Sequence, residues 1–107
     1  MEEVKIVFQK EAILFLDDLI EILFRKNYFS YKENSEAYVS DIYQFIEENI
    51  SSFPNKNVPN VLKHLGSKYI FYNSNQRTTW FVFFENQNNN YLITYILNNH
   101  CIEAKYL

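Results

Sequence analysis

Apolar residues recur every three or four positions in the first half of the chain. Between Lys10 and about Lys26, the recurring positions are Ala12, Ile13, Leu16, Leu19, Ile20, Leu23 and Phe24. A second run ends near Ile50, with Tyr38, Ile42, Phe45, Ile46 and Ile50 at the apolar positions. This spacing predicts two amphipathic helices. The second begins with Asn34 or Ser35 as its cap, and the short segment 27–34 joins the two as a helical hairpin.

Strand-forming residues dominate the second half. The segments 68–72, 79–85 and 91–97 are rich in aromatic and β-branched residues, and Asn-rich turns separate them. Short connections join antiparallel neighbours, so we expect a three-stranded meander. The N-terminal segment Val4–Phe8 can add a fourth strand. The span 51–60 holds both prolines and is predicted to be a loop. Residues 61–65 are predicted to form one helical turn or an extended lead-in to the sheet, and Gly66 a plain turn.

The alternation within the strands predicts that both faces of the sheet are apolar. Trp80, Val82 and Phe84 share one face of the middle strand, and Phe81 and Phe83 share the other. Strict alternation in the last strand sets Tyr91, Ile93, Tyr95 and Leu97 against Leu92, Thr94 and Ile96. The helices can cover only one face, so the other lies under the C-terminal tail or binds a partner.

The predicted fold class is therefore α+β, a helical hairpin packed on a small antiparallel sheet in the order β-α-α-β-β-β. The length of the chain, 107 residues, fits one domain, 1–107, and a content of 48% hydrophobic residues suffices for a core. The lone Cys101 excludes an internal disulfide framework and a cysteine metal site. We expect no metal or other cofactor. No apolar run is long enough for a membrane span and no signal peptide is visible, so we expect a cytoplasmic protein.

The charges are unevenly distributed along a chain of net charge −3. Acidic residues are concentrated in the first 48 positions, and none occurs between Asn49 and Phe84. That acid-free span carries four bases, namely Lys56, Lys63, Lys68 and Arg77. A local cationic face can bind phosphate even on an acidic protein. The alternative is that the four bases are merely solvated.

Three segments together resemble the RelE/ParE toxin superfamily. Residues Leu65 to Ile70 resemble its glycine-basic-tyrosine entry to the first meander strand, and Thr79 to Glu85 resemble the middle strand of a Bacteroidetes-type branch. The last strand is similar too, closed by Asn98, Asn99 and His100. The resemblance implies the toxin of a type II toxin–antitoxin pair, whose cognate antitoxin blocks it. Some members of the superfamily cut mRNA on the ribosome, and others poison DNA gyrase.

For a ribonuclease, the resemblance implies attack by a 2′-hydroxyl on the adjacent phosphate, without a metal. Such a site needs a proton acceptor, cations for the phosphate charge and an acid for the leaving oxygen. The candidate catalytic residues are His100, which titrates near neutral pH, Arg77, whose fork suits phosphate, and Tyr106. The candidate RNA-binding residues are Lys63, Lys68, Lys105 and Tyr69, the last by stacking on a base. The plainer interpretations are a polar strand end for His100, a solvated turn for Arg77 and a packed tail for Tyr106.

Three functional hypotheses remain open. The first is a ribosome-dependent mRNA endonuclease, although a pI near 5.3 works against tight RNA binding. The second is a non-enzymatic toxin that binds DNA gyrase or another protein through the aromatic sheet face and the tail. Gyrase-poisoning members often place arginines after the histidine, whereas here Cys101, Ile102 and Glu103 follow His100. The third is a repurposed, non-toxic interaction module of the same fold.

Overall fold

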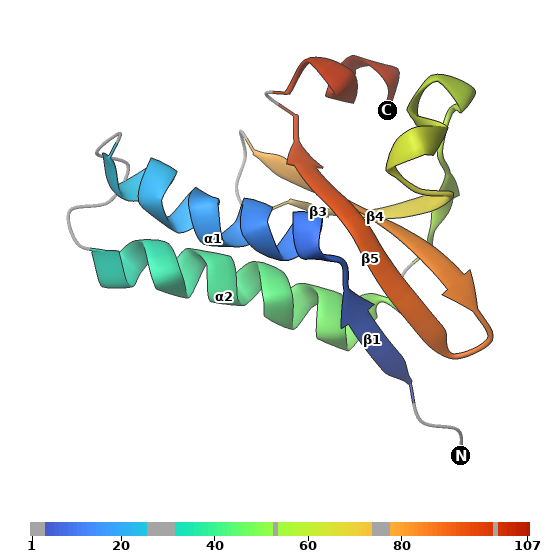
Figure 1. The fold of residues 1–107 in the computed structure, drawn as a ribbon, viewed down its shortest axis with the longest axis horizontal. Helices are drawn as coiled ribbons and strands as arrows, with labels where there is room; N and C mark the ends of the chain where they lie inside the picture. The colour runs from blue at the N-terminus through green and yellow to red at the C-terminus, as the bar shows by residue number, and fades with distance from the viewer. Residues whose placement is uncertain (1–3, 26–31, 53, 74–77, 100) are drawn as a thin grey trace.

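The structure, a computed structural model, describes residues 4–25, 32–52, 54–73, 78–99 and 101–107. It combines two long helices with a sheet and two 3₁₀ turns (Figure 1). The elements are β1 (Lys5–Phe8), α1 (Lys10–Arg25), α2 (Lys32–Asn49), β2 (Lys56–Asn57), η1 (Asn60–Leu65), β3 (Lys68–Asn73), β4 (Thr79–Gln87), β5 (Asn90–Asn98) and η2 (Ile102–Tyr106). The α+β class predicted from the sequence is confirmed.

The sheet has five strands in the order β1-β5-β4-β3-β2. The meander β3-β4-β5 is antiparallel as predicted, but β1 pairs with β5 in the parallel direction, with Ile6 opposite Tyr91. The expectation of a purely antiparallel sheet is therefore wrong. Only short connections enforce antiparallel neighbours, and both helices and the rest of the sheet separate β1 from β5 along the chain. The loop predicted over 51–60 also contains the two-residue strand β2.

The helices follow the predicted spacing, with one correction. α1 begins at Lys10 as expected, and its predicted end at Lys26 lies outside the described residues, as does most of the predicted connection. α2 begins already at Lys32, so Asn34 and Ser35 lie inside the helix and cannot be its N-cap. The capping prediction is therefore wrong.

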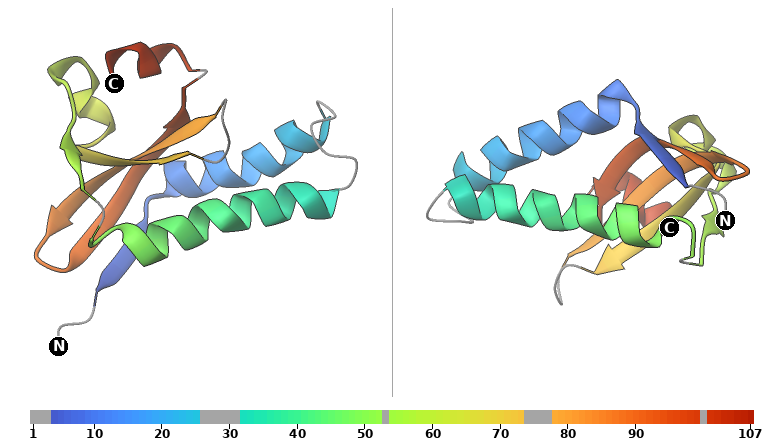
Figure 2. Two further views of the ribbon diagram at one scale, coloured as in Figure 1. Left: turned by 180° about the vertical axis from the view of Figure 1, so that it is seen from behind. Right: turned by 90° about the horizontal axis from the view of Figure 1, so that it is seen from below.

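Both helices pack on one face of the sheet (Figure 2). The helix-side core consists of Ala12, Leu16, Leu19, Val39, Ile42, Ile46, Ile50, Ile70, Trp80, Val82, Phe84, Ile93 and Ile96. Trp80 is only 2% exposed, and its indole Nε1 donates a hydrogen bond of 2.8 Å to the Tyr38 hydroxyl. This bond ties α2 to the central strand β4, and it satisfies a polar group that would be costly to bury alone.

The opposite face carries a second core beneath the two 3₁₀ turns. It consists of Val58, Leu62, Tyr69, Phe83 and Leu97, with Leu65, Phe81, Tyr95, Cys101, Ala104 and Leu107 packed around them. The chain after β5 thus folds back over this face, as one of the two sequence interpretations expected. Figure 1 shows η1 and η2 together at one end of the sheet, away from the β4–β5 hairpin.

A β-bulge in β5 changes which side chains face which core. Phe83 pairs with Tyr95 and Phe84 pairs with Ile93, which leaves Thr94 as an extra residue. Ile93 therefore lies in the helix-side core, whereas Tyr95 packs against the second core. The strict alternation predicted for this strand is wrong beyond Thr94, while the faces predicted for β4 are confirmed.

Gly66 lies against this bulge, and it is more than the plain turn predicted from the sequence. A Cβ atom at Gly66 would lie 2.6 Å from Thr94 Oγ1, 3.1 Å from Phe83 Cβ and 3.2 Å from the Phe84 backbone nitrogen. The Thr94 hydroxyl in turn donates a hydrogen bond of 2.5 Å to the Leu65 carbonyl. The φ of Gly66 is 160°, which is extended backbone. Close approach to the neighbouring strands, not a left-handed conformation, is thus what calls for glycine here.

Candidate functional site

The start of β4 and the end of β5 meet at one end of the sheet. The Thr79 backbone nitrogen donates a 3.0 Å hydrogen bond to Asn99 Oδ1, and the Asn99 nitrogen donates a 3.0 Å bond back to the Thr79 carbonyl. Thr79 Oγ1 also donates a 2.6 Å bond to Asn73 Oδ1. We call Asn73, Thr79 and Asn99 the sheet-end junction. It fixes the point from which β4 starts and the point at which β5 ends.

Two predicted catalytic residues flank this junction in the chain. Arg77 precedes Thr79 by two positions, and His100 directly follows Asn99. Both residues lie outside the described part of the structure. The hydrogen bonds between Thr79 and Asn99 therefore connect the two segments that carry them.

The asparagine pair before His100 has a structural role that the sequence did not reveal. Asn99 bonds the start of β4, and Asn98 accepts a 3.0 Å hydrogen bond on its carbonyl from the Cys101 nitrogen. The Asn98 side chain also accepts from Cys101 Sγ at 3.6 Å. These contacts turn the chain at the end of β5 and direct it into η2.

The tail residues Lys105 and Tyr106 lie on the surface of η2. The tyrosine side chain is 46% exposed, and Lys105 Nζ lies 5.1 Å from the centre of its ring. Such a cation over an aromatic face is weakly attractive at an exposed site. The neighbouring Ala104 and Leu107 pack against the second core. The tail is therefore anchored while its tyrosine hydroxyl and its ammonium stay close to solvent.

The predicted phosphate-binding lysines are not gathered on one surface. Lys63 is exposed on η1, and its ammonium donates a long, 3.4 Å hydrogen bond to the Ser67 carbonyl. Lys68 is half-buried at the start of β3, and alternation places it on the same side as Ile70, which is the helix side. Lys56, also from the acid-free span, lies over the Phe71 ring at 5.6 Å.

Tyr69, proposed from the sequence to stack on a base, belongs to the second core. It is 7% exposed, and its ring centre lies 5.9 Å from that of Phe81 and 5.8 Å from that of Phe83. A ring in this position is shielded from solvent and would have to move before it could stack on a nucleotide.

Two tyrosines on the helix side have perturbed acidity. Burial raises the pKa of Tyr72, and the nearby Asp41 and Tyr38 raise it further. Burial also raises the pKa of Tyr43, assisted by Asp17. In both side chains the raised pKa favours the protonated phenol.

Within the described ranges, no three His, Cys, Asp or Glu side chains come together as a metal site. No helix in the same ranges is long and apolar enough to cross a bilayer. Comparison of the chain with protein-family models, curated proteins and solved structures finds no match. The candidate site therefore rests on the residues themselves.

Proposed function

We propose that the protein is the toxin of a type II toxin–antitoxin pair with a RelE/ParE-like fold. In this proposal it acts in the cytoplasm as a ribosome-dependent mRNA endonuclease. The observation that supports this function best is the sheet-end junction. Its hydrogen bonds join the segments carrying Arg77 and His100, and η2 with Tyr106 begins three positions beyond Asn99.

The proposed chemistry uses side chains alone. His100 accepts the proton of a ribose 2′-hydroxyl, whose oxygen then forms a bond to the adjacent phosphorus. Arg77 stabilises the negative charge that develops on the phosphate oxygens. Tyr106 donates a proton to the 5′-oxygen as its bond to phosphorus breaks. The products are a 2′,3′-cyclic phosphate and a 5′-hydroxyl end. Lys105, beside Tyr106 on η2, adds positive charge for the RNA backbone.

The cognate antitoxin is the partner that we propose for the free toxin. A segment of that antitoxin would cover the sheet-end junction and η2, since Arg77 and His100 are close in sequence to the junction and Tyr106 belongs to η2. The Lys105 ammonium at the surface of η2 provides a point of attraction for an acidic antitoxin segment.

A second candidate function is a non-enzymatic toxin that binds DNA gyrase or another protein through the tail. Ile102 is 74% exposed on η2 and lies close in sequence to the half-exposed Tyr106. Exposed apolar side chains favour contact with a protein surface over contact with RNA phosphates. The aromatic sheet face is a weaker candidate for that contact, because Phe83 and Tyr69 are buried.

Induction of the chain in a bacterium, with sequencing of new mRNA 5′ ends, separates these functions. The nuclease predicts growth arrest with new 5′ ends inside translated regions. His100→Ala and Arg77→Ala should abolish both effects, and His64→Ala, a matched change on the exposed η1, should preserve them. Arrest with intact mRNA that is lost in Ile102→Ser would favour the second candidate. Normal growth with the folded protein present would refute both.

A further inference from the structure

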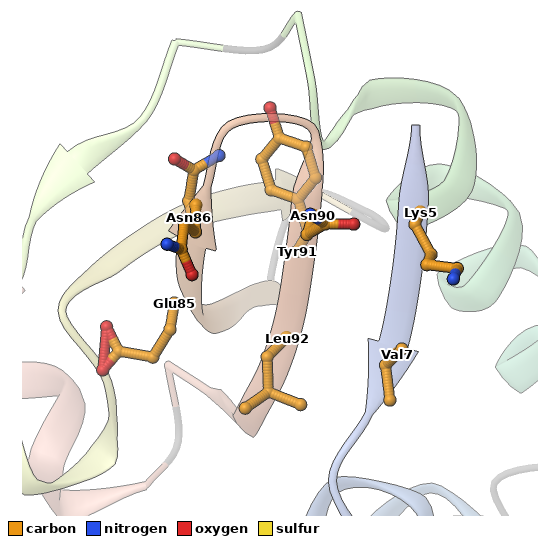
Figure 3. Close-up of a pocket in the computed structure, with 8 residues that line it drawn as sticks. Lys5, Val7, Glu85, Asn86, Asn90, Tyr91 and Leu92 are labelled. Atoms are coloured by element: carbon orange, nitrogen blue, oxygen red, sulfur yellow. The ribbon is translucent and has the colours of Figure 1, made fainter. Parts of the chain in front are cut away.

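A pocket of about 540 Å³ lies at the β4–β5 hairpin, far from the sheet-end junction. Its lining includes Lys5, Val7, Glu85, Gln87, Asn90 and Leu92. The strand register explains how they meet, because Val7, Leu92 and Glu85 form one row across β1, β5 and β4, and Lys5, Asn90 and Gln87 form the next. Figure 3 shows Glu85 and Lys5 on opposite sides of Leu92. The volume falls in the range of ligand-binding pockets.

η1 and η2 pack over the other end of this sheet face, and Figure 1 shows both turns away from the β4–β5 hairpin. The pocket lies on the same face of β4 as Phe83, which is fully buried, and it begins at Glu85, which is exposed. Val7, on the edge strand β1, is 53% exposed. The two rows together thus present the apolar side chains of Val7 and Leu92, with the cation of Lys5 at one corner and the anion of Glu85 at the opposite corner.

The two charges define what the pocket can accept. Among the described residues, neither the Lys5 ammonium nor the Glu85 carboxylate has an ion-pair partner. The two residues are two strands and two positions apart, so their Cα atoms are separated by about 12 Å. A single amino acid is too short to reach both charges, whereas an extended peptide of five residues spans about 13 Å between its end positions.

We propose that this pocket binds an extended peptide segment of a partner protein with an acidic, an apolar and a basic side chain at alternate positions. Alternate side chains of an extended chain point to the same side. The acid then faces Lys5, the apolar side chain covers Val7 and Leu92, and the base faces Glu85. The amides of Gln87 and Asn90 can bond the peptide backbone. This site is independent of the proposed nuclease, because it lies at the other end of β4.

The test is titration of the isotope-labelled protein with the peptide acetyl-Glu-Thr-Leu-Thr-Lys-amide, followed by NMR. We expect saturable shift changes at Val7, Glu85 and Leu92. The peptide ending in Glu in place of Lys should bind about two- to fivefold more weakly, because a rim ion pair is worth that much in affinity. Replacing the central Leu by Ser should also weaken binding, because it removes the group that covers Leu92.

The protein variant Glu85→Lys should reverse the preference, so that the peptide with two acids binds better. Glu47→Lys, which makes the same charge change on the exposed side of α2, should leave the preference unaltered. If the peptides ending in Lys and in Glu bind equally well to the wild type, Glu85→Lys and Glu47→Lys, the proposed charge recognition is overturned. No shift changes at millimolar peptide, or changes confined to residues outside the pocket, would overturn the site.

Discussion

Replacement of Gly66 by alanine tests whether the bulge in β5 and the turn before β3 are packed against each other. The new Cβ would lie 2.6 Å from Thr94 Oγ1, which is closer than Cβ atoms approach their neighbours in proteins. The threonine hydroxyl must therefore move. Movement breaks its bond to the Leu65 carbonyl, at a cost of about 0.5–1.5 kcal/mol. The remaining tight contacts with Phe83 and Phe84 add about 1–3 kcal/mol. The lower entropy of unfolded alanine offsets about 0.4–1 kcal/mol.

We therefore expect Gly66→Ala to lower the free energy of unfolding by about 0.5–4 kcal/mol. Urea denaturation followed by circular dichroism measures this change as a lower midpoint with an unchanged m-value. Ser67→Ala, next in the chain and exposed, should change stability by less than about 0.5 kcal/mol.

A double-mutant cycle with Thr94→Ala makes the test specific. The second change removes the clashing hydroxyl, so the double variant should be more stable than the sum of the single effects predicts. A Gly66→Ala protein with wild-type stability would refute the reasoning. So would strict additivity of the two changes.

Three further predictions concern the helix-side core and the sheet-end junction. Tyr38→Phe removes the acceptor of the buried Trp80 N–H, so it should lower the free energy of unfolding by about 1–3 kcal/mol in urea denaturation. An unchanged free energy of unfolding would show that this hydrogen bond contributes nothing to stability. Asn99→Ala removes the acceptor of the Thr79 N–H, so amide hydrogen exchange at Thr79 should accelerate while exchange at Ile70 stays slow. Burial raises the folded-state pKa of Tyr43 and Tyr72 above 10.0, so stability should be intact below pH 10 and fall as the pH rises towards the folded values. The variant with both tyrosines changed to Phe should lose less stability in this pH range, and an identical loss would contradict the assignment.

Local periodicity predicted most of the elements but not the features that arise from contacts between distant residues. The faces of β4 followed from alternation, because every second residue from Trp80 to Phe84 enters the same core. In β5 the same rule failed at Thr94, since nothing in the local sequence distinguishes an extra residue in an apolar strand. The tight packing of Gly66 was equally hidden, because it depends on a strand that lies far along the chain.

The candidate site was predictable in residue type and less so in arrangement. The sequence indicated Asn98, Asn99 and His100 as a unit, and the structure gives the two asparagines hydrogen-bonding roles at the end of β5. Tyr69 was a candidate for stacking on a base, yet in the structure its side chain belongs to the second core. The β4–β5 pocket was not foreseen, because its charges come from Lys5 and Glu85, which lie far apart in the sequence.

The most direct test of the proposed function is a cell-free translation reaction that contains the purified protein, read out by primer extension on the translated mRNA. We predict cleavage only while ribosomes are translating, with His100→Ala inactive and His64→Ala fully active. Intact mRNA in the presence of folded wild-type protein, or equal cleavage by the His100→Ala variant, would contradict the proposed function.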